Sequence, residues 1–242
     1  MFPVKDTVPR RDFPYITWMI ILINGMVFLF EISLPEDSLK QLFYLFGVVP
    51  ARYSHPDWAV LFGLPLDDYW PFITNMFLHG GWIHIIGNMW MLYLFGDNVE
   101  DRMGHGRFLV FYLLSGIAAS ITYFIFDMHS TVPAIGASGA IAGVMGAYLV
   151  MFPTARVITL IPIFFLPFFI EIPAFLYLGV WFASQVFSGT FSLLAPEAGG
   201  GIAWWAHIGG FIAGMVLLPV FRKKKRSYRK YFPDEIYSNL YK

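Results

Sequence analysis

Cysteine is absent from this chain of 242 residues. Disulfide bonds, thiol catalysis and Cys-ligated metal sites are therefore excluded. Charge is also scarce, because Asp, Glu, Lys and Arg together make up only 13% of the residues. A soluble domain of ordinary composition carries about twice that fraction. These two shortages argue against a disulfide-stapled secreted domain and against a soluble enzyme.

Long apolar runs are what the chain has instead. Hydrophobic residues make up 57% of it, and the mean hydropathy is +0.61. Several runs reach the roughly 20 residues that cross a bilayer core of about 30 Å. The first run lacks a small-residue cleavage site, so we interpret it as a span and not as a signal peptide. We expect an all-α, multi-pass membrane protein with six spans, at residues 16–33, 82–95, 108–126, 136–152, 170–188 and 202–221.

The connections differ strongly in character. Residues 34–70 form a long first loop with an amphipathic piece at 39–46, and its many aromatic rings favour the headgroup zone of a bilayer. Residues 96–107 are predicted to be a polar turn, and residues 189–201 a Gly-rich loop. Between the fourth and fifth spans, an interfacial segment is expected to about residue 169, because interior prolines break a helix. Those prolines are Pro162, Pro167 and Pro173.

Basic residues orient the spans. With six spans both termini lie on one side, together with the turns after the second and fourth spans. Of the 16 lysines and arginines, all except Lys40 and Arg52 fall on that side. An excess of Lys and Arg marks the cytosolic side. We therefore expect cytosolic termini and an outward-facing first loop.

Polar residues inside spans are functional candidates, because burying them unsatisfied is costly. Of six histidines, only His84 and His207 lie within predicted spans. Helical rise places Ser138 and His207 each about 22 Å from the cytosolic end of its span, and His84 about 20 Å. Asn88 lies about one turn deeper than His84. The serine and both histidines are thus predicted to share one layer in the outer half of the membrane.

Small residues at four-residue spacing let membrane helices approach closely. The fourth span carries Gly139-xxx-Gly143, and the sixth carries Ala206-xxx-Gly210-xxx-Gly214. We interpret these glycines as structural. Close packing of the two spans would bring Ser138 within hydrogen-bond reach of His207.

A serine becomes a useful nucleophile when an adjacent base takes its proton, and histidine is suited to this at neutral pH. No Asp or Glu is well placed inside a span to orient His207, so the pattern predicts a dyad and not a triad. The backbone N–H of Ser138, at a helix N-terminus, and the side chains of His84 and Asn88 on one helix face could form an oxyanion hole. The Gly-x-Ser-Gly run is not a nucleophile elbow, which needs a preceding strand.

Three motifs together resemble the rhomboid intramembrane serine proteases over about residues 16–221. They are HGGWIHIIGN at 79–88, GASG at 136–139 and AHIGGFIAG at 206–214. The resemblance implies a rhomboid bundle, with Ser138 as nucleophile, His207 as base, and His84 with Asn88 at the oxyanion hole. It also implies single-span membrane substrates cut near the outer face after a small residue. The fifth span and the Gly-rich loop look like the family's lateral gate and cap.

Two departures from the family pattern stand out. Members usually carry Trp-Arg in the first loop, whereas this chain has Trp70-Pro71, which leaves the anchoring of that loop open. Some members stack a tyrosine on the catalytic histidine, four residues after the serine. Here that residue is Ala142. Support for His207 is expected from elsewhere, with Trp90 and Trp181 as candidates.

The hypothesis is an intramembrane serine endopeptidase without cofactor or metal, whose partners are single-span membrane proteins and the lipid bilayer, not nucleic acid. The alternatives are a catalytically silent relative that binds membrane clients, and a transporter. Retention of all four site residues argues against the first, and the lack of paired broken helices argues against the second. The layout looks like that of a bacterial inner-membrane protein. We divide it into a cytosolic segment (1–15), the protease domain (16–221) and a basic cytosolic tail (222–242).

Overall fold

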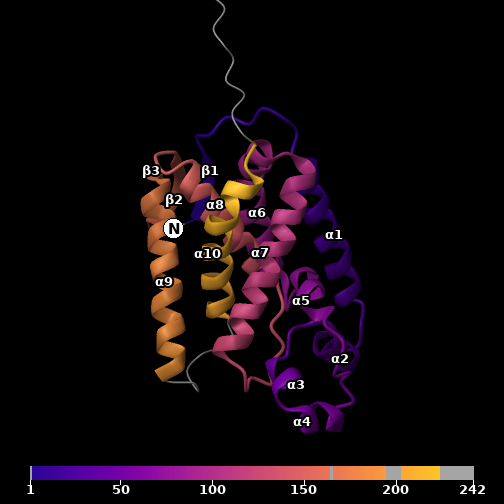
Figure 1. Cartoon of the computed structure of the whole chain (residues 1–242). Coiled ribbons are helices and arrows are strands. Elements are labelled where there is room, and N and C mark those ends of the chain that lie inside the picture. The colour runs from indigo at the N-terminus through magenta and orange to yellow at the C-terminus, as the bar shows by residue number, and fades with distance from the viewer. Residues whose placement is uncertain (1, 164–165, 195–202, 224–242) are drawn as a thin grey trace, which may run out of the picture.

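The computed structural model describes residues 2–163, 166–194 and 203–223 (Figure 1). Residues 195–201 of the Gly-rich loop predicted at 189–201, and the basic tail beyond 223, lie outside these residues. The described chain is mostly helical and carries one small sheet. Its elements are β1 (Phe2–Asp6), α1 (Tyr15–Glu31), α2 (Glu36–Phe46), α3 (Pro50–Ser54), α4 (Pro56–Leu61), α5 (Pro71–Thr74), η1 (Asn75–Phe77), α6 (Trp82–Met103), α7 (His105–Phe126), α8 (Ser138–Met151), β2 (Arg156–Ile163), β3 (Leu166–Pro173), α9 (Ala174–Leu194) and α10 (Trp204–Phe221).

Long apolar helices make this an integral membrane protein. Within the described ranges, three helices are long and apolar enough to cross a membrane: α7, α9 and α10. Helices α1 and α8 are apolar but shorter, with 17 and 14 residues. Figure 1 shows α7, α9 and α10 running along the long dimension of the bundle. Large apolar side chains remain exposed on α9 and α10, as expected of surfaces that face lipid.

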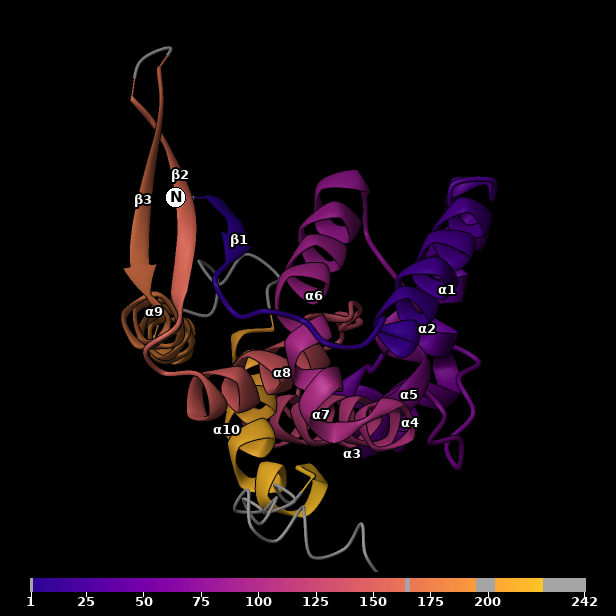
Figure 2. The ribbon, with the colours of Figure 1, turned by 90° about the horizontal axis from the view of Figure 1, so that it is seen from above.

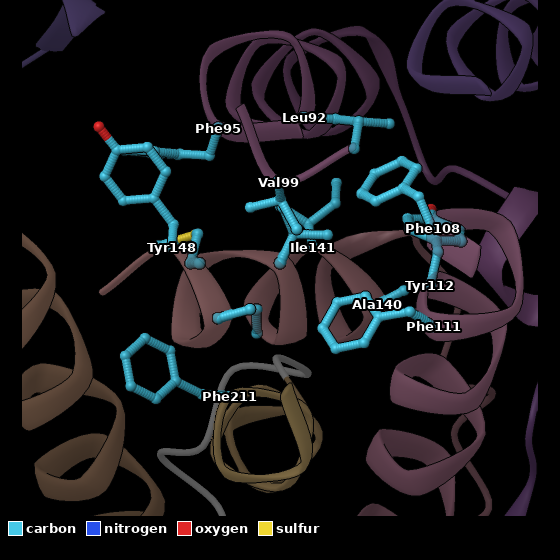
Figure 3. Packing of buried hydrophobic residues seen from close by; sticks show 14 of the residues in the cluster. Leu92, Phe95, Val99, Phe108, Phe111, Tyr112, Ala140, Ile141, Tyr148 and Phe211 are labelled. Atoms are coloured by element: carbon cyan, nitrogen blue, oxygen red, sulfur yellow. The ribbon is translucent and has the colours of Figure 1, made fainter. Parts of the chain in front are cut away.

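Helix α8 is the centre of the bundle. Every residue from Gly139 to Tyr148 is buried. Figure 3 shows α8 surrounded by apolar side chains from neighbouring helices. Leu92 and Phe95 reach it from α6, Phe111 and Tyr112 from α7, and Phe211 from α10. A helix that begins at Ser138 and is buried on all sides gives that serine a fixed position.

Glycines set the distance between α8 and α10. A Cβ added to Gly210 would overlap the carbonyl oxygen of Gly139, and one added to Gly214 would overlap that of Gly143. No side chain therefore fits between the two backbones at these points. The close approach predicted from the small-residue spacing is confirmed.

The expectation of an all-α protein is wrong for residues 156–173, which form a β-hairpin where an interfacial segment to about residue 169 and the start of the fifth span at residue 170 were expected. Strands β2 and β3 pair antiparallel, and β1 pairs antiparallel with β2, giving the order β1-β2-β3. The prolines break helix as expected, and Ile, Val, Thr and Phe between them favour strands. Pro162 is tolerated in the central strand because β1 extends only along residues 157–160 of β2.

Two predicted boundaries are also wrong. The turn expected at 96–107 is helical as far as Met103, where Gly104 ends α6 with a φ of 82°. The extra turns place the Glu100 carboxylate 2.9 and 2.8 Å from the backbone N–H groups of Ile16 and Thr17, so it caps α1. Helix α9 continues past Gly189 to Leu194. Polar residues and a lone glycine are compatible with helix, so the sequence pattern ended both helices too early.

The first loop (residues 34–70) contains three short helices, α2, α3 and α4, with a buried arginine at its centre, and α5 and the 3₁₀ turn η1 follow it. Arg52 is fully buried, and its Nε and Nη1 donate to the carbonyls of Pro65 (2.6 Å) and Leu45 (3.2 Å). Its Nη2 lies 3.1 Å from Asp68 Oδ2. One guanidinium thus ties three parts of the loop together. Arg52 supplies the anchoring that the Trp70-Pro71 departure left open.

Candidate active site

Ser138 is the first residue of α8. Gly136, two residues earlier, has a φ of 123°, a conformation that favours glycine, and its N–H donates to the Asn75 carbonyl (2.8 Å). Helix α8 begins at Ser138, directly after this turn. Because the first N–H groups of a helix have no intrahelical acceptor, the backbone N–H of Ser138 is a free donor at the positive end of α8.

His207 contacts that serine from α10. Its Nε2 lies 2.8 Å from Ser138 Oγ, and its Nδ1 lies 2.8 Å from the Oε1 of Gln185 on α9. The Gln185 amide nitrogen donates to the Trp181 carbonyl (3.2 Å) and to Ser184 Oγ (2.9 Å), which leaves Oε1 to accept. Nδ1 is therefore the protonated nitrogen. The lone pair of Nε2 faces the serine, as proton transfer from Ser138 requires.

His84 and Asn88 lie together on α6, beside the turn before Ser138. Gly80 N–H approaches His84 Nδ1 at 3.4 Å, so Nε2 is the N–H donor of this ring. A Cβ added to Gly136 would lie 2.6 Å from that Nε2 and 3.5 Å from Asn88 Nδ2. Among the described residues, the buried Asn88 Nδ2 has no hydrogen-bond partner. Two side-chain donors thus point into the space next to Gly136 and Ser138.

His79 lies outside the helices and behind this pair. It is buried, and its ring packs edge-on against His84 with 5.1 Å between centroids. Burial, with a smaller contribution from His84, lowers the pKa of His79 to about 3. A neutral imidazole at this position packs against His84 without adding positive charge to the site.

Gln185 is the site residue that the sequence reasoning missed. The search for a partner of His207 considered carboxylates and aromatic rings, whereas the structure provides an amide that is 5% exposed. A polar residue within an apolar helix was the available signal. Trp181 does lie near His207, with ring centroids 5.9 Å apart. The Trp90 alternative is wrong, because that indole donates to the Pro3 carbonyl instead (2.7 Å).

Two cavities adjoin Ser138. A cleft of about 1180 Å³ is lined by α6, α8, α9 and the start of α10, and it contains Ser138, His207, His84 and Asn88. A second cavity of about 20 Å³ lies between Asn75, Ser120 and Gly139. It has room only for a group about the size of a water molecule. The large cleft suits an elongated apolar ligand, and the small cavity suits a small side chain.

Apolar helices surround the Ser138–His207 pair, so this is a membrane protein with a polar site inside its helical bundle. Residues 66–224 match the family model described as "Rhomboid domain", and the chain belongs to the Rhomboid family. It is 32% identical over 141 residues to a putative rhomboid protease YdcA of Bacillus subtilis (strain 168), covering 58% of this chain and 64% of that protein. It is 44% identical over 118 residues to rhomboid protease GluP of the same organism, covering 46% of this chain and 23% of that protein.

A third relative is the mitochondrial RHOMBOID-like protein 6 of Arabidopsis thaliana, 41% identical over 83 residues. The match covers 34% of this chain and 26% of that protein. The chain thus spans about a quarter to just under two thirds of the length of these curated relatives. Both Bacillus relatives are named as rhomboid proteases.

Proposed function

We propose that this chain is an intramembrane serine endopeptidase with Ser138 as nucleophile and His207 as general base. The observation that carries the proposal is the 2.8 Å contact between Ser138 Oγ and His207 Nε2, with the other ring nitrogen held by Gln185. A Ser–His pair in this tautomer has the geometry of an activated nucleophile. The third group of a triad is here an amide, which orients the ring without adding charge.

The reaction follows from these positions. Ser138 Oγ attacks the peptide carbonyl carbon while its proton passes to His207 Nε2. The tetrahedral oxyanion receives hydrogen bonds from the Ser138 N–H, His84 Nε2 and Asn88 Nδ2. The C–N bond then breaks, and His207 returns the proton to the leaving amine. Water deprotonated by His207 hydrolyses the acyl-enzyme and restores the serine.

The proposed substrates are single-span membrane proteins, cut near the outer face after a small residue. The large cleft between α6 and α9 has the volume and the apolar lining for part of a transmembrane segment. The small cavity beside Ser138 has the volume of about one methyl group, in keeping with a small residue before the scissile bond. With α9 as the mobile wall of the cleft, the substrate would enter sideways from the lipid.

The proposed topology keeps six spans in residues 16–221, with α1, α6, α7, α8, α9 and α10 as the spans. Residues 1–15 and 222–242 would lie on the cytosolic side, with strand β1 reaching from that side into the cleft, and the membrane would be a bacterial inner membrane. The charge distribution supports this orientation, because basic residues are nearly absent from the opposite side. The arginine-centred first loop would then lie at the outer interface.

Fluorophosphonate labelling tests the activity directly, because these reagents phosphonylate serines that a base activates. We expect the wild-type protein in detergent or liposomes to incorporate one label at Ser138 and to cleave a reconstituted single-span substrate. Peptide mapping locates the label, and Ser33→Ala serves as a matched variant on an exposed hydroxyl. A folded protein that neither labels nor cleaves would favour the alternative, a silent relative that binds membrane clients.

Gln185 offers a second test, because it acts on the reaction only through His207. Replacing it by leucine keeps the volume and removes the acceptor. A hydrogen bond to a charged group contributes about 1.5–3 kcal/mol. We therefore expect Gln185→Leu to lower kcat about 10- to 100-fold with little change in KM. Gln185→Glu retains the acceptor and should restore most of the rate, measured as initial cleavage rates in liposomes. Equal rates for the leucine variant and the wild type would remove Gln185 from the mechanism.

A further inference from the structure

At its inner end the wall of the large cleft includes the N-terminal strand beside the membrane helices. Phe2 and Pro3 of β1 line the same cavity as Ser138 and His207. The Phe2 ring packs against Trp90 of α6 with 5.2 Å between centroids, and Trp90 Nε1 donates to the Pro3 carbonyl (2.7 Å). Despite these contacts, Phe2 is 48% exposed. An apolar ring is thus presented at the end of an apolar cleft.

Strand β1 is held there by a buried carboxylate. Asp6 is 8% exposed, and its Oδ2 accepts hydrogen bonds from Tyr148 Oη of α8 (2.5 Å) and from Asn98 Nδ2 of α6 (2.8 Å). Outside the membrane spans, burial raises the pKa of Asp6, and the bond from Tyr148 opposes that rise. The carboxylate fastens the strand to two helices that line the cleft.

Along its other edge, β1 pairs with the β2–β3 hairpin, which leads into α9 on the far side of the cleft. Phe2 pairs with Leu160 and Pro3 with Thr159 of β2. Strand β3 continues the sheet and passes directly into α9 at Ala174. Figure 2 shows β1 between α6 and the β2–β3 hairpin, with α9 below the hairpin. The strand therefore bridges the two walls of the cleft.

Positions along α6 give the depth of strand β1 relative to the scissile bond of a substrate. His84 and Trp90 are separated by six residues of continuous helix, a rise of about 9 Å. A substrate helix lying along α6 with its scissile bond at Ser138 would therefore reach Phe2 about six residues farther into the membrane.

We propose that Phe2 and Pro3 form an inner subsite of the substrate cleft. This subsite binds the apolar side chain about six residues on the cytosolic side of the scissile bond. The inference rests on the proposed function and adds to it a contact that the serine–histidine site does not contain. The occupant is the inner part of the substrate's own transmembrane segment, because the subsite is continuous with the cavity that holds Ser138.

Site-specific photocrosslinking tests the contact. Benzoylphenylalanine replaces Phe2 in the full chain, and Phe13 is the matched control, since it is similarly exposed (50%) but packs against Tyr15. On illumination with substrate in liposomes, position 2 should yield an adduct about six residues past the scissile bond, located by mass spectrometry. Position 13 should yield none. An adduct from neither position, or equally from both, would overturn the subsite.

Kinetics give an independent readout. Half-burial of a phenylalanine ring corresponds to about a five- to tenfold change in affinity. We expect Phe2→Ala to raise KM by that factor for a transmembrane substrate, and Phe13→Ala to leave KM unchanged. Fluorophosphonate labelling of Ser138 should be equal in both variants. Unlabelled wild-type protein would refute the proposed function itself, whereas normal labelling with unchanged KM in Phe2→Ala would refute only the subsite.

Discussion

Replacing Ser138 by alanine is expected to reduce peptide-bond cleavage to the background rate, a loss of about 10⁴-fold or more. The variant removes Ser138 Oγ, which lies 2.8 Å from His207 Nε2. Ser138 is half-buried at the start of α8, so alanine fits there and helix packing is retained. The measurement is the initial rate on a reconstituted single-span substrate, with thermal unfolding recorded alongside.

Combining Ser138→Ala with His207→Ala tests the dyad more sharply than either substitution alone. His207→Ala should lose as much activity as Ser138→Ala, and the double variant should be no slower than the single ones, because nucleophile and base act as one unit. His129→Ala, on an exposed histidine of the α7–α8 connection, is the control for loss of an imidazole. Measurable turnover by Ser138→Ala, or additive losses in the double variant, would contradict the dyad.

The contact between Ser138 and His207 was predictable from the sequence because it depends on local quantities. Helical rise gives each residue's depth, and the glycines at 139, 143, 210 and 214 give the close approach of α8 and α10. Neither argument needs the rest of the fold. Both residues lie on helices whose ends were placed to within a few residues.

The sheet and the Gln185 contact were not predictable in the same way. Strand β1 pairs with residues more than 150 positions away, and no turn or spacing in either segment identifies its partner. Five polar-flanked residues at the start of the chain carry too weak a pattern to be read as a strand. Gln185 contacts His207 because α9 packs beside α10 at the level of these two residues. Such packing between helices cannot be read from the local sequence. Both missed features are therefore contacts between segments far apart in the sequence.

Removal of the Asn88 amide is expected to cost about 10²–10³ in kcat, the usual loss for one oxyanion-hole donor. Its Nδ2 is buried and unpartnered within the described ranges, 3.5 Å from the position of a Cβ on Gly136. A donor in that state gains its hydrogen bond only when an oxyanion forms, so KM should change little. His84→Ala should behave similarly, because His84 Nε2 points into the same space.

Two isosteric variants separate donation from packing. Asn88→Leu removes the donor, and Asn88→Asp places a carboxylate where negative charge develops, so the aspartate variant should be the slower of the two. Ile86→Ala, on the same helix and 58% exposed, should retain wild-type kcat. Fluorophosphonate labelling should slow in parallel with kcat, because the phosphonyl oxygen uses the same donors. If either Asn88 variant raised KM at constant kcat, Asn88 would be a wall of the cleft and the oxyanion hole would rest on His84 and the Ser138 N–H alone.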